Sequence, residues 1–114
     1  KSDPINPQTL MNMFGDDMEK SQMFLVKFLK QAIDITHEIT LAFEQESIDE
    51  ITFQSHKLKS SARAVGADAL ADLCQDLEFS SRDSDQARVD VLMTELNPVL
   101  EQVKEAIENM NIPA

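Results

Sequence analysis

Aromatic residues, glycine, proline and cysteine are all scarce in this chain of 114 residues. It contains no Trp or Tyr, two Gly, four Pro and one Cys. An all-β protein needs a turn every few residues and therefore more glycine and proline, so the composition favours helices. The single Cys74 cannot form an internal disulfide, which excludes a disulfide-stapled secreted domain. A reducing compartment is compatible with this, and we expect a cytoplasmic protein.

Basic residues are also few, with ten Lys and Arg against 21 Asp and Glu, and the formal net charge is −11. Nucleic acids and anionic membrane surfaces are bound through Lys and Arg, so this balance argues against both as partners. No apolar run approaches the roughly 20 residues of a membrane span. The length suits one domain, residues 1–114, with one core. Because the chain begins at Lys1 rather than Met, we expect a domain cut from a longer polypeptide.

Capping signals indicate where helices begin and end. The signals are, in chain order, Asn6-Pro7, Gly15, Asp16 with Glu19 in capping-box spacing, Ser47 with Glu50 in the same spacing, Gly66, and Asp68 as the cap of a fourth helix. Together with the spacing of apolar residues they predict helices over residues 7–14, 17–45, 48–65, 68–82 and 85–110.

Each long helix carries one apolar stripe. Leu70, Leu73, Cys74 and Leu77, for example, recur at the spacing of one helical face. Pro98 interrupts the last stripe and should kink that helix or restart it with Asn97 as a new cap. Four long amphipathic helices with short connections predict an all-α fold, an antiparallel four-helix bundle with a short N-terminal extra helix.

The stretch SHKLKSSARAVG, Ser55 to Gly66, gathers basic residues around one of the two histidines. Each helical residue turns about 100°, which places His56 about 160° from Leu58 on the core stripe. The residues that share this outward face with His56 are Thr52, Phe53, Lys59, Ser60 and Arg63. A histidine beside cations and a small residue favours an exposed nucleophile that meets a phosphoryl group. On spacing alone, a merely solvated face remains an equal alternative.

A family resemblance rests on two longer segments. SHKLKSSARAVGADALADLCQDLE, Ser55 to Glu78, resembles the phosphohistidine motif of histidine-containing phosphotransfer (HPt) domains. That motif is H-x-L-K-G-[SA]-A, followed by a Gly-Ala turn and a helix with the pattern L..LC..LE. LMNMFGDDMEKSQMFLVKFL, Leu10 to Leu29, resembles the first two helices of the same family. Ser60 departs from the pattern, because the family usually has Gly there, although Ser is nearly as small.

The resemblance implies a phosphorelay intermediate. His56 would accept a phosphoryl group from a receiver-domain aspartyl phosphate and pass it to another receiver aspartate. Lys59 would stabilise the phosphoryl charge, and Arg63 would either assist in this or steer the acidic receiver site. Neutral imidazole suits the role, because it is nucleophilic near pH 7.

The resemblance also implies partners and excludes cofactors. The partners would be response-regulator receiver domains, and the domain would be free-standing or the tail of a hybrid sensor kinase. The sequence has no phosphate-binding glycine-rich loop and no carboxylate cluster beside His56. We therefore expect a carrier, not an enzyme, without bound ATP or cofactor, and with Mg²⁺ held by the receiver. We expect a monomer, since one face of the bundle must stay open for docking.

The docking surface is less clearly marked than the nucleophile. We expect it to include Thr52, Phe53, Lys59, Ser60 and Arg63. Leu10 and Phe14 either extend its apolar part or close the top of the bundle. An alternative function is a helical docking module without phosphotransfer, although such a module would not need His56 and Lys59 on its outward face.

Two further residues are expected to have no role. Asp34-x-x-His37 is similar to half of a di-iron bundle motif, but the second half is missing, so His37 is expected to be a plain surface histidine. Cys74 lies in an apolar stripe and is expected to be a buried, inert thiol.

Overall fold

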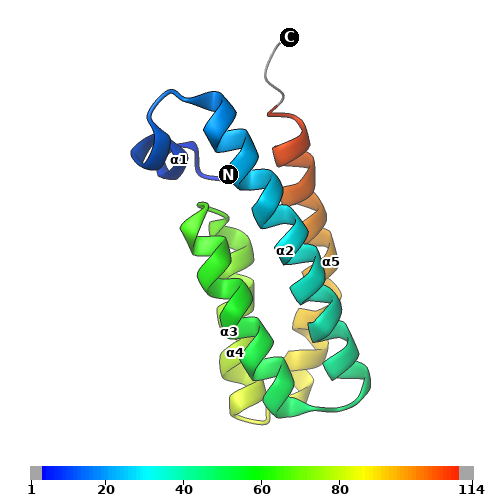
Figure 1. Ribbon diagram of the computed structural model, residues 1–114. Helices are drawn as coiled ribbons and strands as arrows, with labels where there is room; N and C mark the ends of the chain where they lie inside the picture. Colours follow the sequence, from blue (N-terminus) through cyan, green and yellow to red (C-terminus); the bar gives the residue numbers. More distant parts are fainter. Residues whose placement is uncertain (1–3, 111–114) are drawn as a thin grey trace.

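The computed structural model describes residues 4–110, and Figure 1 shows these as a bundle of helices. The helices are α1 (Pro7–Phe14), α2 (Met18–Glu44), α3 (Ile48–Ala64), α4 (Asp68–Arg82) and α5 (Gln86–Glu108). α2 to α5 run alternately up and down, and α1 lies at the end of the bundle where α2 begins. The structure confirms the all-α prediction, and the helix bounds agree with the predicted ones to within two residues.

The predicted apolar stripes form the core. Fully buried side chains come from all four long helices, among them Leu25, Ile39, Ile51, Leu58, Leu70, Leu77, Leu92 and Leu96. Burying a side chain of this size stabilises the fold by about 1.5–3 kcal/mol. Cys74 is completely buried in the same core, as predicted. Burial raises the pKa of its thiol to about 12, so the reactive thiolate is suppressed at neutral pH.

Three predicted caps differ in detail. Asp17, not Asp16, caps α2 by accepting a hydrogen bond from the backbone N–H of Lys20 at 3.0 Å. Ser47 precedes α3 as predicted, but its side chain caps nothing. Ala67, not Asp68, is the N-cap of α4. Asp68 instead starts the helix, where its negative charge interacts favourably with the helix dipole.

The α3–α4 turn seats α1. Gly66 has φ of +79°, a conformation that L side chains rarely adopt. Its carbonyl accepts a hydrogen bond from the Asn6 N–H at 2.8 Å, and an added Cβ would meet the Thr9 side chain at 2.8 Å. Glycine is therefore needed here both for the backbone conformation and for the close approach of α1.

α5 continues through Pro98, so the predicted restart at Asn97 is wrong. Proline removes one N–H and leaves the Thr94 carbonyl without its helical donor. Thr94 and Pro98 both lie on the exposed side of α5, where water can bind that carbonyl. The apolar residues on the opposite side keep the helix packed on both sides of the proline.

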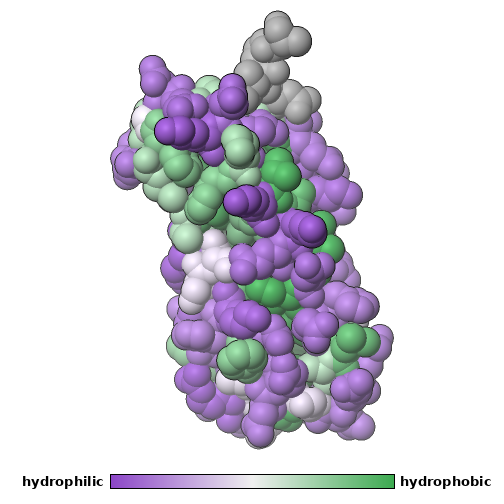
Figure 2. Space-filling view, in the orientation of Figure 1, coloured by the Kyte–Doolittle hydropathy of each residue, from purple (hydrophilic) through white to green (hydrophobic). Residues whose placement is uncertain are grey.

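The outer surface is mostly polar, with one apolar region at the α1 end. Figure 2 shows apolar side chains gathered where α1 meets the first turns of α2, above a largely hydrophilic surface with separate apolar spots. Exposed apolar residues of α1 and of the first turns of α2 are Met11, Met13, Met18, Met23 and Val26. Within residues 4–110, no helix has the length and apolar character that a membrane span requires.

Candidate functional site

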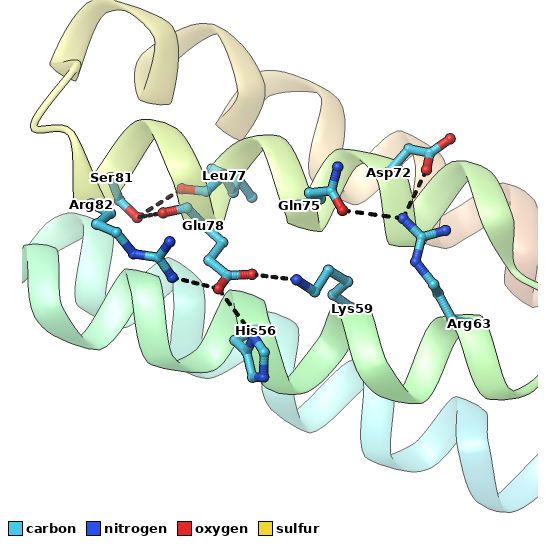
Figure 3. Close-up of polar contacts among 9 residues, drawn as sticks. All are labelled: His56, Lys59, Arg63, Asp72, Gln75, Leu77, Glu78, Ser81 and Arg82. Carbon is cyan, nitrogen blue, oxygen red and sulfur yellow. Dashed lines mark hydrogen bonds and ion pairs between the residues drawn. The ribbon is translucent and has the colours of Figure 1, made fainter.

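His56 lies in the middle of α3 and faces α4. Figure 3 shows its ring beside Glu78 of α4, and 59% of its side-chain surface is exposed. The imidazole Nδ1 lies 3.0 Å from Oε2 of Glu78. The Gly66 turn makes α3 and α4 antiparallel neighbours, so residues far apart in the sequence face each other in register. Thr52 and Ser81, whose hydroxyl oxygens lie 2.7 Å apart, are another such pair.

Glu78 is the centre of the polar cluster. Only 4% of its side-chain surface is exposed, yet three basic groups reach its two oxygens. Lys59 Nζ lies 2.8 Å from Oε1, while Arg82 Nη2 and His56 Nδ1 lie 2.7 and 3.0 Å from Oε2. Burial acts to raise the pKa of Glu78, but the contacts and charges of Lys59 and His56 outweigh it and hold the pKa below the ordinary value. Glu78 is thus an anion at neutral pH.

The hydrogen bond to Glu78 determines which imidazole nitrogen is free. A carboxylate can only accept hydrogen bonds, so in neutral His56 the proton lies on Nδ1, which donates to Oε2. Nε2 then carries the lone pair, on the side of the ring that faces away from Glu78. The arrangement therefore presents a neutral nucleophilic nitrogen at the surface of the bundle.

Lys59 and Arg82 are held on opposite sides of Glu78 (Figure 3). Lys59 is largely buried, with 17% of its side-chain surface exposed, whereas Arg82 is 56% exposed. Both cations lie over the ring of Phe79, at 5.6 Å for Lys59 and 5.5 Å for Arg82. An aromatic face attracts cations, so Phe79 helps to hold both side chains in place.

An open cleft of about 550 Å³ lies beside His56, between the first turns of α3 and the last turn of α4. Its lining includes Thr52, Phe53, Glu78 and Arg82. The exposed nitrogen nucleophile, the anchored cations and the space for an incoming group are what a phosphoryl acceptor requires.

Comparison with known proteins identifies the family. The family model described as the Hpt domain matches residues 23–111. The chain belongs to the Hpt domain family. It is a histidine phosphotransfer intermediate of two-component phosphorelays, and Hpt domains are phosphoryl carriers, not catalysts, that work with response-regulator receiver domains.

A solved structure supports the fold of this Hpt domain. The crystal structure of histidine-containing phosphotransfer protein B from Pseudomonas aeruginosa PAO1 is similar, with a TM-score of 0.87 at 16% sequence identity. The match covers 96% of this chain and 95% of that one. A search of curated proteins finds no match.

The structure brings together some of the residues predicted for this Hpt domain and separates others. His56, Phe53 and Ser60 are exposed on α3, as predicted. Thr52 is only partly exposed and spans the α3–α4 contact through Ser81. Arg63 turns away from His56, and its Nη2 contacts Asp72 Oδ1 at 3.1 Å and Gln75 Oε1 at 3.4 Å (Figure 3).

Three further residues considered in the sequence analysis lie outside the cluster around Glu78. Leu10 is buried and closes the bundle, so it is not part of an open docking surface. Phe14 is partly exposed and packs edge-on against Phe24, with ring centroids 5.5 Å apart. His37 is exposed on α2, and no hydrogen bond or ion pair within residues 4–110 involves its ring.

Sequence reasoning missed the roles of Glu78 and Arg82. Glu78 ends the L..LC..LE pattern, four residues after Cys74 and next to Leu77, and so it lies on the buried stripe of α4. A carboxylate at a buried position needs cationic or hydrogen-bonding partners, which was the available signal. Arg82, four residues later, is the expected helical neighbour of Glu78.

Proposed function

We propose that His56 is the phosphoacceptor of this Hpt domain. Its Nε2 lone pair attacks the phosphorus of a receiver aspartyl phosphate, so that an N–P bond forms as the P–O bond to the aspartate breaks. The aspartate leaves as a carboxylate, and the reverse reaction loads a second receiver. The observation that carries this proposal is the 3.0 Å contact between His56 Nδ1 and buried Glu78, which leaves Nε2 free and exposed.

Glu78 also stabilises the positive charge that forms on the imidazole ring. Once Nε2 carries a phosphoryl group and Nδ1 keeps its proton, the imidazole ring becomes cationic. A buried carboxylate at hydrogen-bonding distance stabilises that cation more strongly than water-exposed charge would. Glu78 is therefore a positioning residue, which acts on the phosphoryl group through His56.

Lys59 is proposed to stabilise the phosphoryl oxygens. It lies one helical turn after His56, and its ammonium is anchored by Glu78 and by the ring of Phe79. Such anchoring reduces the entropy lost when the cation meets the developing charge. Arg63 is paired with Asp72 instead, which favours a role in docking the receiver over a role in the chemistry.

The remaining parts of the reaction are assigned to the partner. We propose that the receiver supplies Mg²⁺ and the acidic pocket, and that this domain binds no ATP, metal or cofactor of its own. Its docking surface would centre on exposed Phe53 and Ser60, with Thr52, Lys59 and Arg63 around them. A cytoplasmic, monomeric domain, free-standing or in a hybrid sensor kinase, fits this role.

Transfer from a phosphorylated receiver tests the proposal. The protein is mixed with the labelled receiver and Mg²⁺, and the label is characterised by its stability in acid and base and by mapping the modified residue. Acid-labile, base-stable label on His56 is the expected result. Label on another residue, or stable complexes with receivers and no transfer, would contradict it and favour the docking module.

A further inference from the structure

Arg82 occupies a different position from the other cations near His56. It lines the open cleft beside the imidazole, and among residues 4–110 it is the one basic residue, apart from His56, that does so. Its Nη2 lies 2.7 Å from Glu78 Oε2, the same oxygen that accepts from His56 Nδ1. The guanidinium and the imidazole are therefore held side by side by one carboxylate oxygen.

Lys59 lies on the other side of Glu78, outside this cleft. Its ammonium contacts the other oxygen of Glu78, it is largely buried, and it does not line the cleft. The other two arginines, Arg63 on α3 and Arg88 on α5, contact other carboxylates of α4. Arg63 contacts Asp72 and Arg88 lies 3.7 Å from Asp76, both at exposed positions away from His56.

The guanidinium of Arg82 has donors to spare. Arginine carries five N–H donors in a planar fork, and the contact with Glu78 engages only Nη2. The ring of Phe79, 5.5 Å from the guanidinium carbon, restricts the plane of the group. Arg82 can thus keep its contact with Glu78 and still offer hydrogen bonds toward the cleft.

The negative charges of a phosphoryl group and of Glu78 favour a cation between them. A phosphoryl group on Nε2 brings negative charge close to the Glu78 carboxylate, and like charges at such distances repel strongly in a partly buried site. A cation that contacts both anions removes this repulsion. Arginine is suited to it because its fork matches the geometry of phosphate oxygens.

We propose that Arg82 is a second phosphoryl-binding residue, which holds the phosphoryl oxygens from the α4 side while it remains paired with Glu78. This inference rests on the proposed phosphorylation of His56. Arg82 stabilises phosphohistidine relative to the free imidazole, so it shifts the equilibrium of transfer and does not act only through docking. Lys59 and Arg82 then bind the phosphoryl group from two sides.

The test measures the equilibrium constant for transfer between a phosphorylated receiver and this domain, at dilutions where the two proteins are mostly apart. Arg82→Ala should shift this equilibrium about 10-fold or more toward the receiver, because hydrogen bonds between charged groups are the strong ones. Arg88→Ala, the control at an exposed arginine of α5 that contacts Asp76 instead of Glu78, should change it less than about 2-fold. Arg82→Lys should recover part of the loss.

A double variant separates phosphoryl binding from support of Glu78. In a Glu78→Gln background there is no carboxylate for Arg82 to hold, so a purely structural Arg82 would have no further effect on the equilibrium. Phosphoryl binding predicts that Arg82→Ala still shifts it. The proposal would be overturned if Arg82→Ala left the equilibrium constant unchanged, with helicity also unchanged, in the wild type or in Glu78→Gln. If wild-type His56 takes no label at all, the proposed function has failed instead.

Discussion

The two histidines of this chain are both exposed on long helices, and each lies beside an open cleft that also contains carboxylates. The cleft at His37, about 650 Å³, is larger than the one at His56, about 550 Å³. Lys57, Asp34 and Glu38 line the His37 cleft. Neither the exposure of a histidine nor the volume of its cleft therefore distinguishes the two places.

The difference lies in the carboxylates. Asp34 and Glu38 are exposed, where water screens their charges, and neither bonds to the His37 ring. Glu78 is buried and bonded to His56 Nδ1, which orients the ring and leaves Nε2 unprotonated. A buried, cation-bound carboxylate converts a surface histidine into a candidate nucleophile, and the two regions give matched pairs of variants.

The largest expected effect separates the two histidines themselves. His56→Gln should abolish phosphoryl acceptance to below detection, while His37→Gln should leave it unchanged. Both side chains point away from the core, so helicity and melting temperature should be nearly unaffected in either variant. Transfer assays and circular dichroism check this. A large drop in melting temperature of His56→Gln, or residual label on that variant, would contradict the assignment.

The next largest effect is expected when the transfer rates of variants at the two lysines of α3 are compared. Lys59→Ala should slow transfer on the order of 100-fold, because it removes an anchored charge that meets the phosphoryl group. Lys57 points toward the His37 cleft and over the ring of Phe53, so Lys57→Ala should change the rate less than about 2-fold. Rapid-quench kinetics of transfer measure both. Equal rates for the two variants would remove Lys59 from the chemistry.

A smaller effect is expected when the stabilities of variants at Glu78 and Glu38 are compared. Glu78→Gln should lower the free energy of unfolding by about 1–3 kcal/mol, because one amide oxygen cannot replace a carboxylate for three basic partners. Glu38→Gln on exposed α2 should change it by less than about 0.5 kcal/mol. Urea denaturation gives both values. A Glu78→Gln variant as stable as the wild type would mean that the cluster contributes little to the fold.

The smallest effect is in the pH dependence of that stability. The native pKa of Glu78 lies below its ordinary value of 4.5, so its contribution is complete above pH 4.5 and is lost as the pH falls through the lowered pKa. The gap in unfolding free energy between wild type and Glu78→Gln should therefore narrow below pH 4.5. Urea midpoints over a pH series measure this. The difference in unfolding free energy between wild type and Glu38→Gln should not narrow in the same way.

The local sequence pattern predicted most of the fold and the exposed position of His56, the proposed nucleophile. The helices, their buried stripes and the outward direction of His56 follow from a rotation of about 100° per residue, which depends only on the spacing along one helix. The caps were less predictable. Asp16 and Asp17 are chemically alike neighbours, and their difference rests on where the turn after Gly15 allows α2 to begin.

The sequence by itself determined a helical bundle with an exposed histidine and nearby cations, because these are properties of single helices. Only the tertiary structure decided which charges meet. His56 and Glu78 are 22 positions apart and touch because the Gly66 turn sets the register of α3 against α4. The same register turns Arg63 toward Asp72 and brings Arg82 beside His56. Distances between side chains of different helices depend on packing, which spacing along one chain does not contain.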